Sequence, residues 1–483
     1  MSRDTESNKR NGQTADAVVG ASVNVSDEQN LHYMHDIGHM SDGLHSIIHS
    51  VEESLSVLKN ITASERGITR LAFTDEDWAG RSYLIKRMEG MGLVVREDAF
   101  GNVIGRLPGL DDSLPPIMSG SHGDSVPEGG NFDGIVGVLS ALEVARLLQD
   151  EKGKSTIRHP YEVIIFMGEE GSRFGAAMIG SEALVGKLTQ ADLDRLTDRE
   201  GTTLRQALQL RNLNDKAIGK PLYDGPIHAY IEAHIEQGRV LEEMKYPLGV
   251  VTGIAGATRH RLTFSGRADH SGATPMNMRR DALCGAAEVI LQAEALASEM
   301  TETANRAALD PEDEYMVAGR IIKHSDLAPV VATAGTLQVT PGALNVIPGA
   351  VELGLDIRSI SKVAKRLVWD ALLGFIESMC ERRDLTVDYR LVMDGTPVVL
   401  KDSMIQVLSD AAKECGVASM LLPSGAGHDA MNMAEITPTG MLFIPCKDGV
   451  SHSPMEWADS IHIANGVRVL EKAVRLLDEK DNL

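Results

Sequence analysis

Apolar, strand-like runs that end in acidic or imidazole side chains are the feature of this sequence that most restricts its fold. The runs PPIMSGSH, YEVIIFMGEE and HAYIEAHIEQG follow one another along the first half of the chain. An amphipathic helical pattern at residues 135–150 separates the first two runs. Alternating strand and helix patterns are typical of an α/β sandwich with a sheet that is parallel at least in part. Because sites in such sheets form where strands end, we expect these polar ends to meet.

A change of pattern near residue 257 predicts a second domain. The segments TRHRLTFSGRADHSG and GTLQVTPGALNVIPGAVELGLDIRSI alternate apolar and polar residues, as in antiparallel strands with one solvated face. The α/β pattern then resumes, with GMLFIPC as a further core strand. We therefore predict an α/β catalytic domain with a mixed, mostly parallel sheet between helices, interrupted by a smaller α+β domain with an antiparallel sheet. The expected ranges are a disordered tail at 1–28, the catalytic domain at 29–256 and 369–483, and the insert at 257–368.

The length of the chain agrees with two domains, and its charge argues against a nucleic-acid partner. The chain has 483 residues, which is too long for one average domain. It carries 47 basic and 69 acidic residues, for a net charge of −22. A nucleic-acid-binding protein would usually show a basic face, and no such pattern is visible. A small anionic substrate would need a local group of Arg and His side chains.

Cysteine usage and hydropathy predict a cytoplasmic protein. The four cysteines, Cys284, Cys380, Cys415 and Cys446, form no CxxC pair, so we expect reduced thiols rather than a disulfide framework. No stretch approaches the ~18 apolar residues of a membrane span, and the amino-terminal residues lack the apolar run of a signal peptide.

Five histidines gather within residues 31–49, and the first three, His32, His35 and His39, have helical spacing. A metal-binding tail is one interpretation of this segment. The alternative is an ordinary, partly exposed helix, which we favour because carboxylates are absent from matching positions.

A second set of metal-ligand residue types is ordered along the catalytic domain. Taken singly, a histidine at a strand end is more often structural than a ligand. Imidazole and carboxylate groups together suit a divalent ion such as zinc or manganese. The set occurs in five segments, Ser121–Asp124, Asn131–Gly134, Gly168–Gly171, Ala233–Gly238 and Ser451–Pro454.

The same segments belong to longer motifs that run from about Gly67 to about Leu477. These motifs are SGSHGDSVPEGGNFDG, GEEGSRFG, HIEQG, HSGATPMNMRRDAL, NVIPG, SGAGHDA and GVSHSPME. In them the sequence resembles the aminoacylase/carboxypeptidase-like di-metal amidohydrolases. The resemblance is to the branch of N-carbamoyl-L-amino-acid hydrolase, allantoate amidohydrolase, ureidoglycolate amidohydrolase and β-ureidopropionase.

The resemblance implies two divalent ions per subunit, Zn²⁺ or Mn²⁺, with Co²⁺ and Ni²⁺ as further options. One ion would be held by His122, Asp133 and His234. The other would be held by Asp133, Glu170 and His452, so that Asp133 bridges the pair. A short carboxylate with two oxygens suits such a bridge, and two ions can acidify a water and polarise a poorly electrophilic ureido carbonyl.

The resemblance also implies how two further carboxylates act. Asp124 would fix the tautomer of His122 from outside the ligand set. Glu169 would be the general base that takes a proton from the attacking water and passes it to the leaving nitrogen.

Substrate contacts and assembly are likewise implied by the resemblance. The insert would be a lid and dimerisation domain of a homodimer, and His270 would polarise the substrate carbonyl across the dimer interface. Arg358 and Asn345 would bind the carboxylate and neighbouring polar groups of a small anionic ureido substrate, since the Arg fork suits a bidentate contact. An interface salt bridge is the alternative for Arg358. Further substrate contacts would come from Gln237, Gly427 and His428, whose alternative role is loop ordering.

The most favoured function is hydrolysis of the carbamoyl C–N bond of an N-carbamoyl-L-amino acid, which releases ammonia, CO2 and the amino acid. Hydrolysis of allantoate or ureidoglycolate is the alternative within the same class. A dipeptidase is disfavoured by HIEQG and SGAGHDA, and a non-catalytic binding protein by the presence of Glu169 and every ligand. Gly123, Gly168, the Ser271–Ala273 segment and extra length at 301–330 depart from relatives and leave the substrate open.

Overall fold

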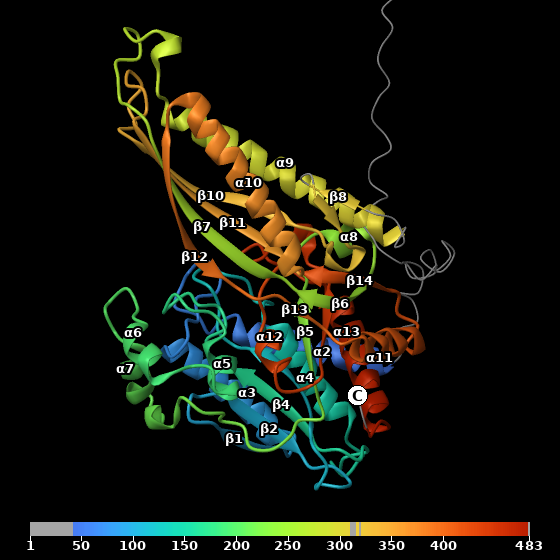
Figure 1. Cartoon of the computed structure of the whole chain (residues 1–483). Coiled ribbons are helices and arrows are strands. Elements are labelled where there is room, and N and C mark those ends of the chain that lie inside the picture. The colour runs from blue at the N-terminus through green and yellow to red at the C-terminus, as the bar shows by residue number, and fades with distance from the viewer. Residues whose placement is uncertain (1–41, 310–314, 318–319, 482–483) are drawn as a thin grey trace, which may run out of the picture. The chain divides into compact units, whose positions relative to one another are not determined.

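The computed structural model describes residues 42–309, 315–317 and 320–481, which form two compact units (Figure 1). The smaller unit is Ala255–Pro397, and the larger one comprises the described residues up to Ile254 and from Val398 onward. The tail predicted at 1–28 and the histidines at positions 32, 35 and 39 lie outside the described residues. His45 and His49 lie on a helix, α2 (Asp42–Leu58).

A mixed sheet forms the centre of the larger unit. Its strand order is β1-β2-β4-β3-β5-β15-β6-β13, with β14 paired to β6. The four central strands, β4, β3, β5 and β15, are mutually parallel, which confirms the predicted mixed sheet with a parallel core. The strands are β1 (Val94–Glu97), β2 (Val103–Leu107), β3 (Ile117–His122), β4 (Tyr161–Phe166), β5 (Ala229–Ile235), β6 (Leu248–Ile254), β13 (Val398–Val399), β14 (Ser419–Ser424) and β15 (Thr439–Ile444).

The central strands are buried along their whole length because helices cover both faces of the sheet. Helices α2, α4, α11 and α13 share one large apolar core with the strands, and α5, α6 and α7 contribute to a second. The remaining helices of this unit are α3 (Asp75–Gly90), α4 (Ile135–Leu147), α5 (Ile179–Val185), α6 (Gln190–Arg195), α7 (Leu204–Leu210), α8 (Val240–Met244), α11 (Asp402–Glu414), α12 (Ala430–Met433) and α13 (Ser460–Asp478). None of the described helices is long and apolar enough to cross a membrane.

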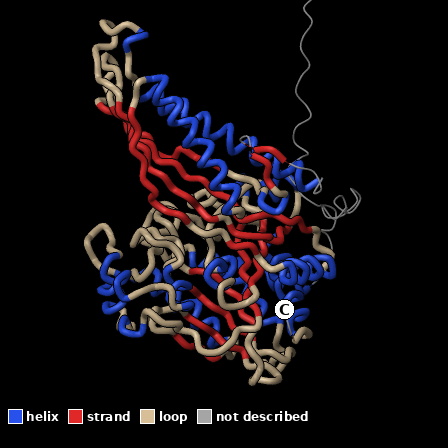
Figure 2. The backbone as a smooth tube through the Cα atoms, viewed as in Figure 1, coloured by secondary structure: helices blue, strands red, loops and turns tan. Residues whose placement is uncertain are grey.

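The smaller unit is an antiparallel sheet with two long helices along one face (Figure 2). The sheet order is β10-β11-β7-β12. Along β11 buried and partly exposed residues alternate without exception, which confirms the period-two prediction of one apolar and one wet face. The elements are β7 (Gly256–Ser265), α9 (Ala282–Leu309), β8 (Tyr315–Val317), β9 (Arg320–Ile322), β10 (Val331–Thr340), β11 (Ala350–Ser359), α10 (Lys362–Arg383) and β12 (Thr386–Asp394).

The smaller unit extends further along the chain than the predicted insert at 257–368. The boundary at 368 falls inside α10, whose apolar residues pack into the core of this unit. Strand β12 pairs with β7 over most of its length, so residues to Pro397 belong here rather than to the catalytic domain. A helical period in a sequence does not say which sheet the helix covers. The extra length at 301–330 forms the end of α9 and the β8–β9 hairpin.

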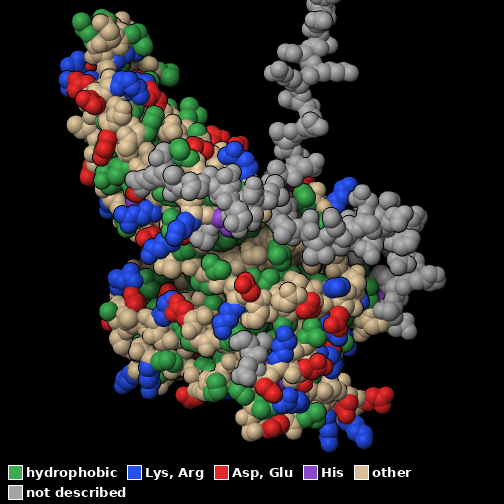
Figure 3. Space-filling model, turned by 45° about the vertical axis from the view of Figure 1, so that its right-hand side comes forward, with side chains coloured by type: hydrophobic (Ala, Val, Ile, Leu, Met, Phe, Trp, Pro, Cys, Tyr) green, Lys and Arg blue, Asp and Glu red, His purple; other side chains and the backbone are tan. Residues whose placement is uncertain are grey.

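The surface mixes charges of both signs. On the face seen in Figure 3, acidic and basic side chains are interspersed rather than gathered into one basic stripe. The four cysteines carry free thiols.

Candidate metal centre and active site

The polar motifs meet because the strands that carry them run in parallel. His122 is the last residue of β3, and it pairs in register with Phe166 at the end of the neighbouring strand β4. Glu169 and Glu170 follow β4, and His234 lies near the carboxyl end of β5, on the other side of β3. The predicted convergence of strand ends is therefore present in the larger unit.

Asp133 lies at the centre of the cluster, with each carboxylate oxygen facing a different set of side chains. Its Oδ1 is 3.3 Å from Nε2 of His122 and 3.1 Å from Nε2 of His234. Its Oδ2 is 3.3 Å from Nε2 of His452, which is also 3.3 Å from Oε2 of Glu170. The five residues thus form two groups of three candidate ligands that share one carboxylate.

Backbone carbonyl groups orient the two buried imidazoles. Nδ1 of His122 lies 3.1 Å from the carbonyl oxygen of Asp124, and Nδ1 of His234 lies 2.9 Å from that of Ile235. A carbonyl oxygen only accepts, so each Nδ1 donates its proton there and Nε2 is directed at Asp133. This orientation presents the nitrogen that a metal ion would bind.

Asp124 contacts the loop that carries the glutamates as well as the imidazole for which it was predicted. Its two carboxylate oxygens accept the backbone N–H groups of Glu169 at 3.1 Å and Glu170 at 3.3 Å. The same carboxylate is 3.6 Å from Nδ1 of His122, farther than the carbonyl of its own residue. The main chain therefore holds the His122 ring more closely, and the Asp124 carboxylate holds the loop after β4.

The glutamates after β4 are buried acids with raised pKa values. Burial, together with the negative charge of Glu170 and Asp429, raises the pKa of Glu169 well above its ordinary value. Burial and the charge of Asp133 raise the pKa of Glu170 to about 7. Oε2 of Glu169 lies 3.9 Å from Nε2 of His122. A buried carboxyl group with a raised pKa is suited to proton transfer near neutral pH.

The donor set fits a divalent cation. Within the described residues, Asp133, Glu169 and Glu170 form ion pairs with histidines and with no Lys or Arg. Oε1 of Glu170 is buried and has no hydrogen-bond partner there. Buried carboxylates need a compensating positive charge, and imidazole with carboxylate is the ligand chemistry of zinc or manganese.

Two of the predicted substrate contacts lie against this cluster. Nε2 of Gln237 donates to Oδ2 of Asp133 at 2.7 Å, and the residue has a positive φ of 59°, a conformation that costs energy away from glycine. His428 follows Gly427 and is buried edge-on against the His234 ring, with centroids 4.6 Å apart. Burial and the neighbouring His234 lower the pKa of His428 well below its ordinary value.

The other predicted substrate contacts belong to the smaller unit. His270 and Asn345 are exposed and lie on adjacent loops, where the Ser271 N–H donates to the Asn345 carbonyl at 3.0 Å. Arg358 lies on the partly exposed face of β11 and donates to Asp356 at 2.8 and 3.3 Å. Asp356 also accepts from Arg259 at 2.8 Å. The structure brings His270 and Asn345 together and gives Arg358 a carboxylate neighbour of its own.

A buried carboxylate that the sequence left without a role completes the cluster. Glu456 is 4% exposed and accepts the N–H of Asp133. The signal was present, because Glu456 stands four residues after His452 in the motif SHSPME. Its partner at position 133 is 323 residues away, so the chain's order alone could not reveal the contact.

The chain matches the family model for peptidase family M20/M25/M40 over residues 118–476, which span every residue of this cluster. It is 36% identical over 431 residues to the N-carbamoyl-L-amino-acid amidohydrolase of Paenarthrobacter aurescens, covering 89% of this chain and 97% of that protein. It is 35% identical over 397 residues to the allantoate deiminase of Arabidopsis thaliana, covering 80% of this chain and 74% of that protein.

A solved structure gives the same result for the fold. The crystal structure of an amidase of the hydantoinase/carbamoylase family from Burkholderia multivorans superposes with a TM-score of 0.79. The two sequences are 34% identical, and the match covers 90% of this chain and 98% of that one.

Proposed function

Since this chain belongs to peptidase family M20/M25/M40, we propose that it hydrolyses the carbamoyl C–N bond of an N-carbamoyl-L-amino acid or a similar ureido acid. The products would be ammonia, CO2 and the amino acid. The observation that carries the proposal is the pair of ligand groups sharing Asp133. The likeness to an N-carbamoyl-L-amino-acid amidohydrolase over 89% of the chain supports the substrate class.

The cofactor of the proposed reaction is a pair of divalent ions, Zn²⁺ or Mn²⁺. His122 and His234 would hold one ion and Glu170 and His452 the other, and Asp133 would serve as a ligand to both. When bound, such ions polarise the substrate carbonyl and acidify the attacking water.

The proton is moved by Glu169. Its carboxylate would take a proton from the attacking water and deliver it to the departing nitrogen of the carbamoyl group. The backbone N–H of Glu169 is held by Asp124 at 3.1 Å, so the base is fixed on a rigid loop. A base held in this way loses little conformational entropy when the substrate binds.

Arg358, His270 and Asn345 would recognise the substrate's polar groups. Asp356 holds the Arg358 guanidinium in one orientation, and the planar fork suits a bidentate contact with a substrate carboxylate. His270 would polarise the carbonyl of the carbamoyl group. If Arg358 instead serves only its ion pair with Asp356, substrate acids and their amides will be hydrolysed equally well.

A ureide substrate is the second candidate. The likeness to an allantoate deiminase, at 35% identity, is nearly as strong as the likeness to the carbamoylase. The test is ammonia release by the metal-loaded protein from several N-carbamoyl-L-amino acids, carbamoyl-β-alanine, allantoate and ureidoglycolate. We expect the largest kcat/KM for an N-carbamoyl-L-amino acid. A larger value for allantoate or ureidoglycolate would replace the first candidate by the second, and hydrolysis of none would contradict both.

We also propose a cytoplasmic homodimer assembled through the smaller unit. The edge strands of its sheet, β10 and β12, expose apolar side chains, including Leu391 and Val392, each 56% exposed on β12. Exposed apolar edges favour pairing with another chain. His270 would then reach the active site of the partner. Sedimentation velocity should give twice the monomer mass, and a monomer at micromolar concentration would contradict the assembly.

A further inference from the structure

Glu456, a carboxylate with no assigned role, accepts hydrogen bonds from two segments that carry candidate metal ligands. Its Oε1 accepts the backbone N–H of Phe132 at 2.9 Å and that of Asp133 at 3.0 Å. Its Oε2 accepts the hydroxyl of Ser451 at 2.9 Å. The side chain is 4% exposed, so these donors are its compensation for leaving water.

The contacts connect two candidate ligands that belong to distant parts of the chain. Asp133 precedes α4, whereas Ser451 immediately precedes His452 in the loop before α13. The Ser451 hydroxyl also lies 3.0 Å from Oδ2 of Asp133. Glu456, Ser451 and Asp133 therefore form a closed ring of polar contacts, and His452 is attached to that ring by one peptide bond.

The backbone at Gly130 packs so closely against the Glu456 carboxylate that no side chain fits between them. A Cβ atom at Gly130 would lie 2.1 Å from Oε1 of Glu456, although the φ of Gly130 is not in the left-handed region. Glycine is needed here for space. Beside the ring, Phe132 and Trp457 pack edge to face with centroids 5.3 Å apart. The two chain segments are thus held by apolar as well as polar contacts.

The two groups of candidate ligands differ in how firmly their histidines are held by the fold itself, apart from the contacts of Glu456. The side chains of His122 and His234 are each 1% exposed and lie on buried strands, whereas that of His452 is 51% exposed and lies on a loop. His452 also has a positive φ of 54°, a strained conformation that the surrounding structure must enforce. The loop contacts matter most for the group that contains His452.

We propose that Glu456 is a positioning residue that fixes His452 relative to Asp133 and thereby sets the affinity of the second metal ion. This inference rests on the proposed pair of ions. Hydrogen-bond partners of metal ligands commonly change metal affinity by about 10- to 100-fold when they are removed. The affinity of the ion held by His122 and His234 depends less on Glu456, because Asp133 is the one ligand of that group whose segment Glu456 contacts.

The first test is Co²⁺ titration of the metal-stripped full-length protein, followed by calorimetry and by the visible spectrum of the bound ion. We expect Glu456→Ala to weaken the binding of the ion at Glu170 and His452 by about 10- to 100-fold and to weaken the binding of the other ion less. Glu456→Gln should lie between, because its amide oxygen can still accept the two backbone N–H groups. Excess Co²⁺ should restore the second spectral signature in both variants.

Glu162→Gln is the matched control. Glu162 is 1% exposed and accepts from Arg96, Arg106 and Tyr223 at the opposite end of β4 from Glu170. Its substitution should lower the midpoint temperature of unfolding without lowering the affinity for the second ion. If the control lowers the affinity for that ion as much as Glu456→Ala does, general destabilisation explains the effect and the proposal is overturned.

Gly130→Ala offers an independent variant that retains the carboxylate but displaces it. We expect it to lower the affinity for the second ion as Glu456→Ala does. The double variant should bind that ion no more weakly than either single variant, because both changes break the same contact. This variant and Glu456→Gln also carry the test if Glu456→Ala does not fold. Additive losses would contradict a shared cause.

Two failures are distinguishable in the same titration. If the unmodified protein binds fewer than two ions, the proposed metal centre fails, and this inference fails with it. If the unmodified protein binds two ions and Glu456→Ala binds both with unchanged affinities, only the role of Glu456 is refuted.

Discussion

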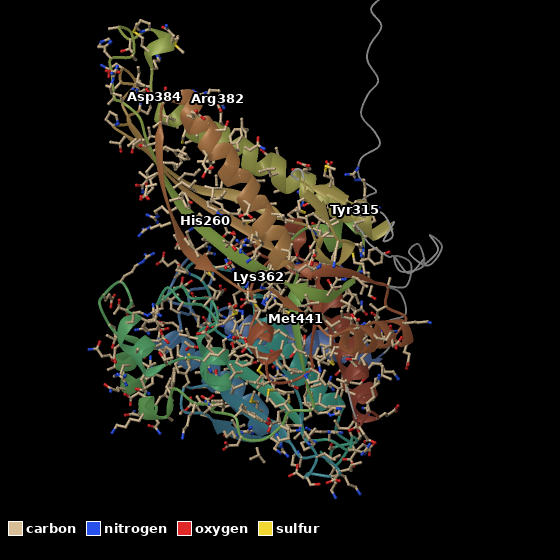
Figure 4. All side chains as sticks on the ribbon, viewed as in Figure 1. His260, Tyr315, Lys362, Arg382, Asp384 and Met441 are labelled. Carbon is tan, nitrogen blue, oxygen red and sulfur yellow. The ribbon has the colours of Figure 1, made fainter. Side chains whose placement is uncertain are left out.

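His452 in the larger unit and His260 in the smaller unit have pKa values that are shifted in opposite directions. A hydrogen bond with Asp133 and the charge of Glu170 raise the pKa of His452 to about 9. In the smaller unit, burial lowers the pKa of His260, on β7, to about 4 (Figure 4). The His260 ring stacks on Trp369 with centroids 3.4 Å apart, and neither ring nitrogen has a hydrogen-bond partner among the residues that the structure describes. An imidazole thus attracts a proton beside buried carboxylates and excludes it where it is buried against an aromatic ring.

The comparison identifies what makes the cluster around Asp133 in the larger unit a candidate cation site. The imidazoles of His122, His234 and His452 face the buried carboxylate of Asp133, so a proton or a metal ion is stabilised among them. The imidazole of His260 instead stacks flat on the indole of Trp369. Histidine count alone therefore predicts little, and the neighbouring charge decides the role.

The largest expected effect separates the two glutamates of the cation site. Glu169→Gln keeps the shape but cannot accept a proton, so we expect kcat to fall by about 100- to 10,000-fold with metal content retained. Glu170→Gln should instead lower metal occupancy, as measured by atomic absorption after dialysis. The reverse pattern would exchange the roles of base and ligand between these two residues.

The next effect tests whether the polar face of the smaller unit recognises an anion. Losing one partner of a charge pair that the bound substrate covers costs about 2–5 kcal/mol, so Arg358→Ala should lower kcat/KM for carboxylate substrates by roughly 30- to 3,000-fold. Arg358→Lys should restore only part, because lysine lacks the planar fork. Arg261→Ala is a control on the neighbouring strand, since Arg261 pairs with Glu352. An amide analogue hydrolysed as fast as the acid by the unmodified protein would refute the clamp.

The smallest effect concerns the pH dependence of stability in the smaller unit. The pKa of His260 is about 4 in the folded state and about 6.5 in an unfolded chain, so the unfolded state binds the proton first. Stability is therefore fully present above about pH 6.5 and is lost as the pH falls towards 4. His260→Phe should keep the stacking on Trp369 and remove this loss. The free energy of unfolding of the variant minus that of the unmodified protein should therefore be larger, meaning a more stable variant, at pH 5 than at pH 8. An equal difference at both pH values would mean that His260 is protonated while folded.

The sequence was most informative where local pattern and topology agree. Parallel strands carry their last residues to one edge, so the meeting of His122, Glu170 and His234 followed from three buried runs with polar ends. The bridging position of Asp133 came from the resemblance, and the structure shows its two oxygens directed at different ligand groups.

The sequence was least informative where the deciding contact joins distant segments. The helical pattern of α10 could not reveal that it packs on the antiparallel sheet, nor could the run TVDYRLVMD reveal that β12 pairs with β7. The position of Asp124 after His122 suggested an imidazole partner, but it could not reveal that the carboxylate also accepts backbone N–H groups 45 and 46 residues away. Such contacts depend on the loop conformations that the folded sheet imposes.

The central claim is that two ions sharing Asp133 perform the hydrolysis of a ureido acid. It is tested most directly by adding Mn²⁺ or Zn²⁺ stepwise to the metal-stripped protein while bound metal and ammonia release from an N-carbamoyl-L-amino acid are measured together. Chelation should abolish ammonia release, and we predict that activity returns mainly with the second equivalent of metal per chain. Full activity in the stripped protein, or a maximum reached with one equivalent bound, would contradict the account.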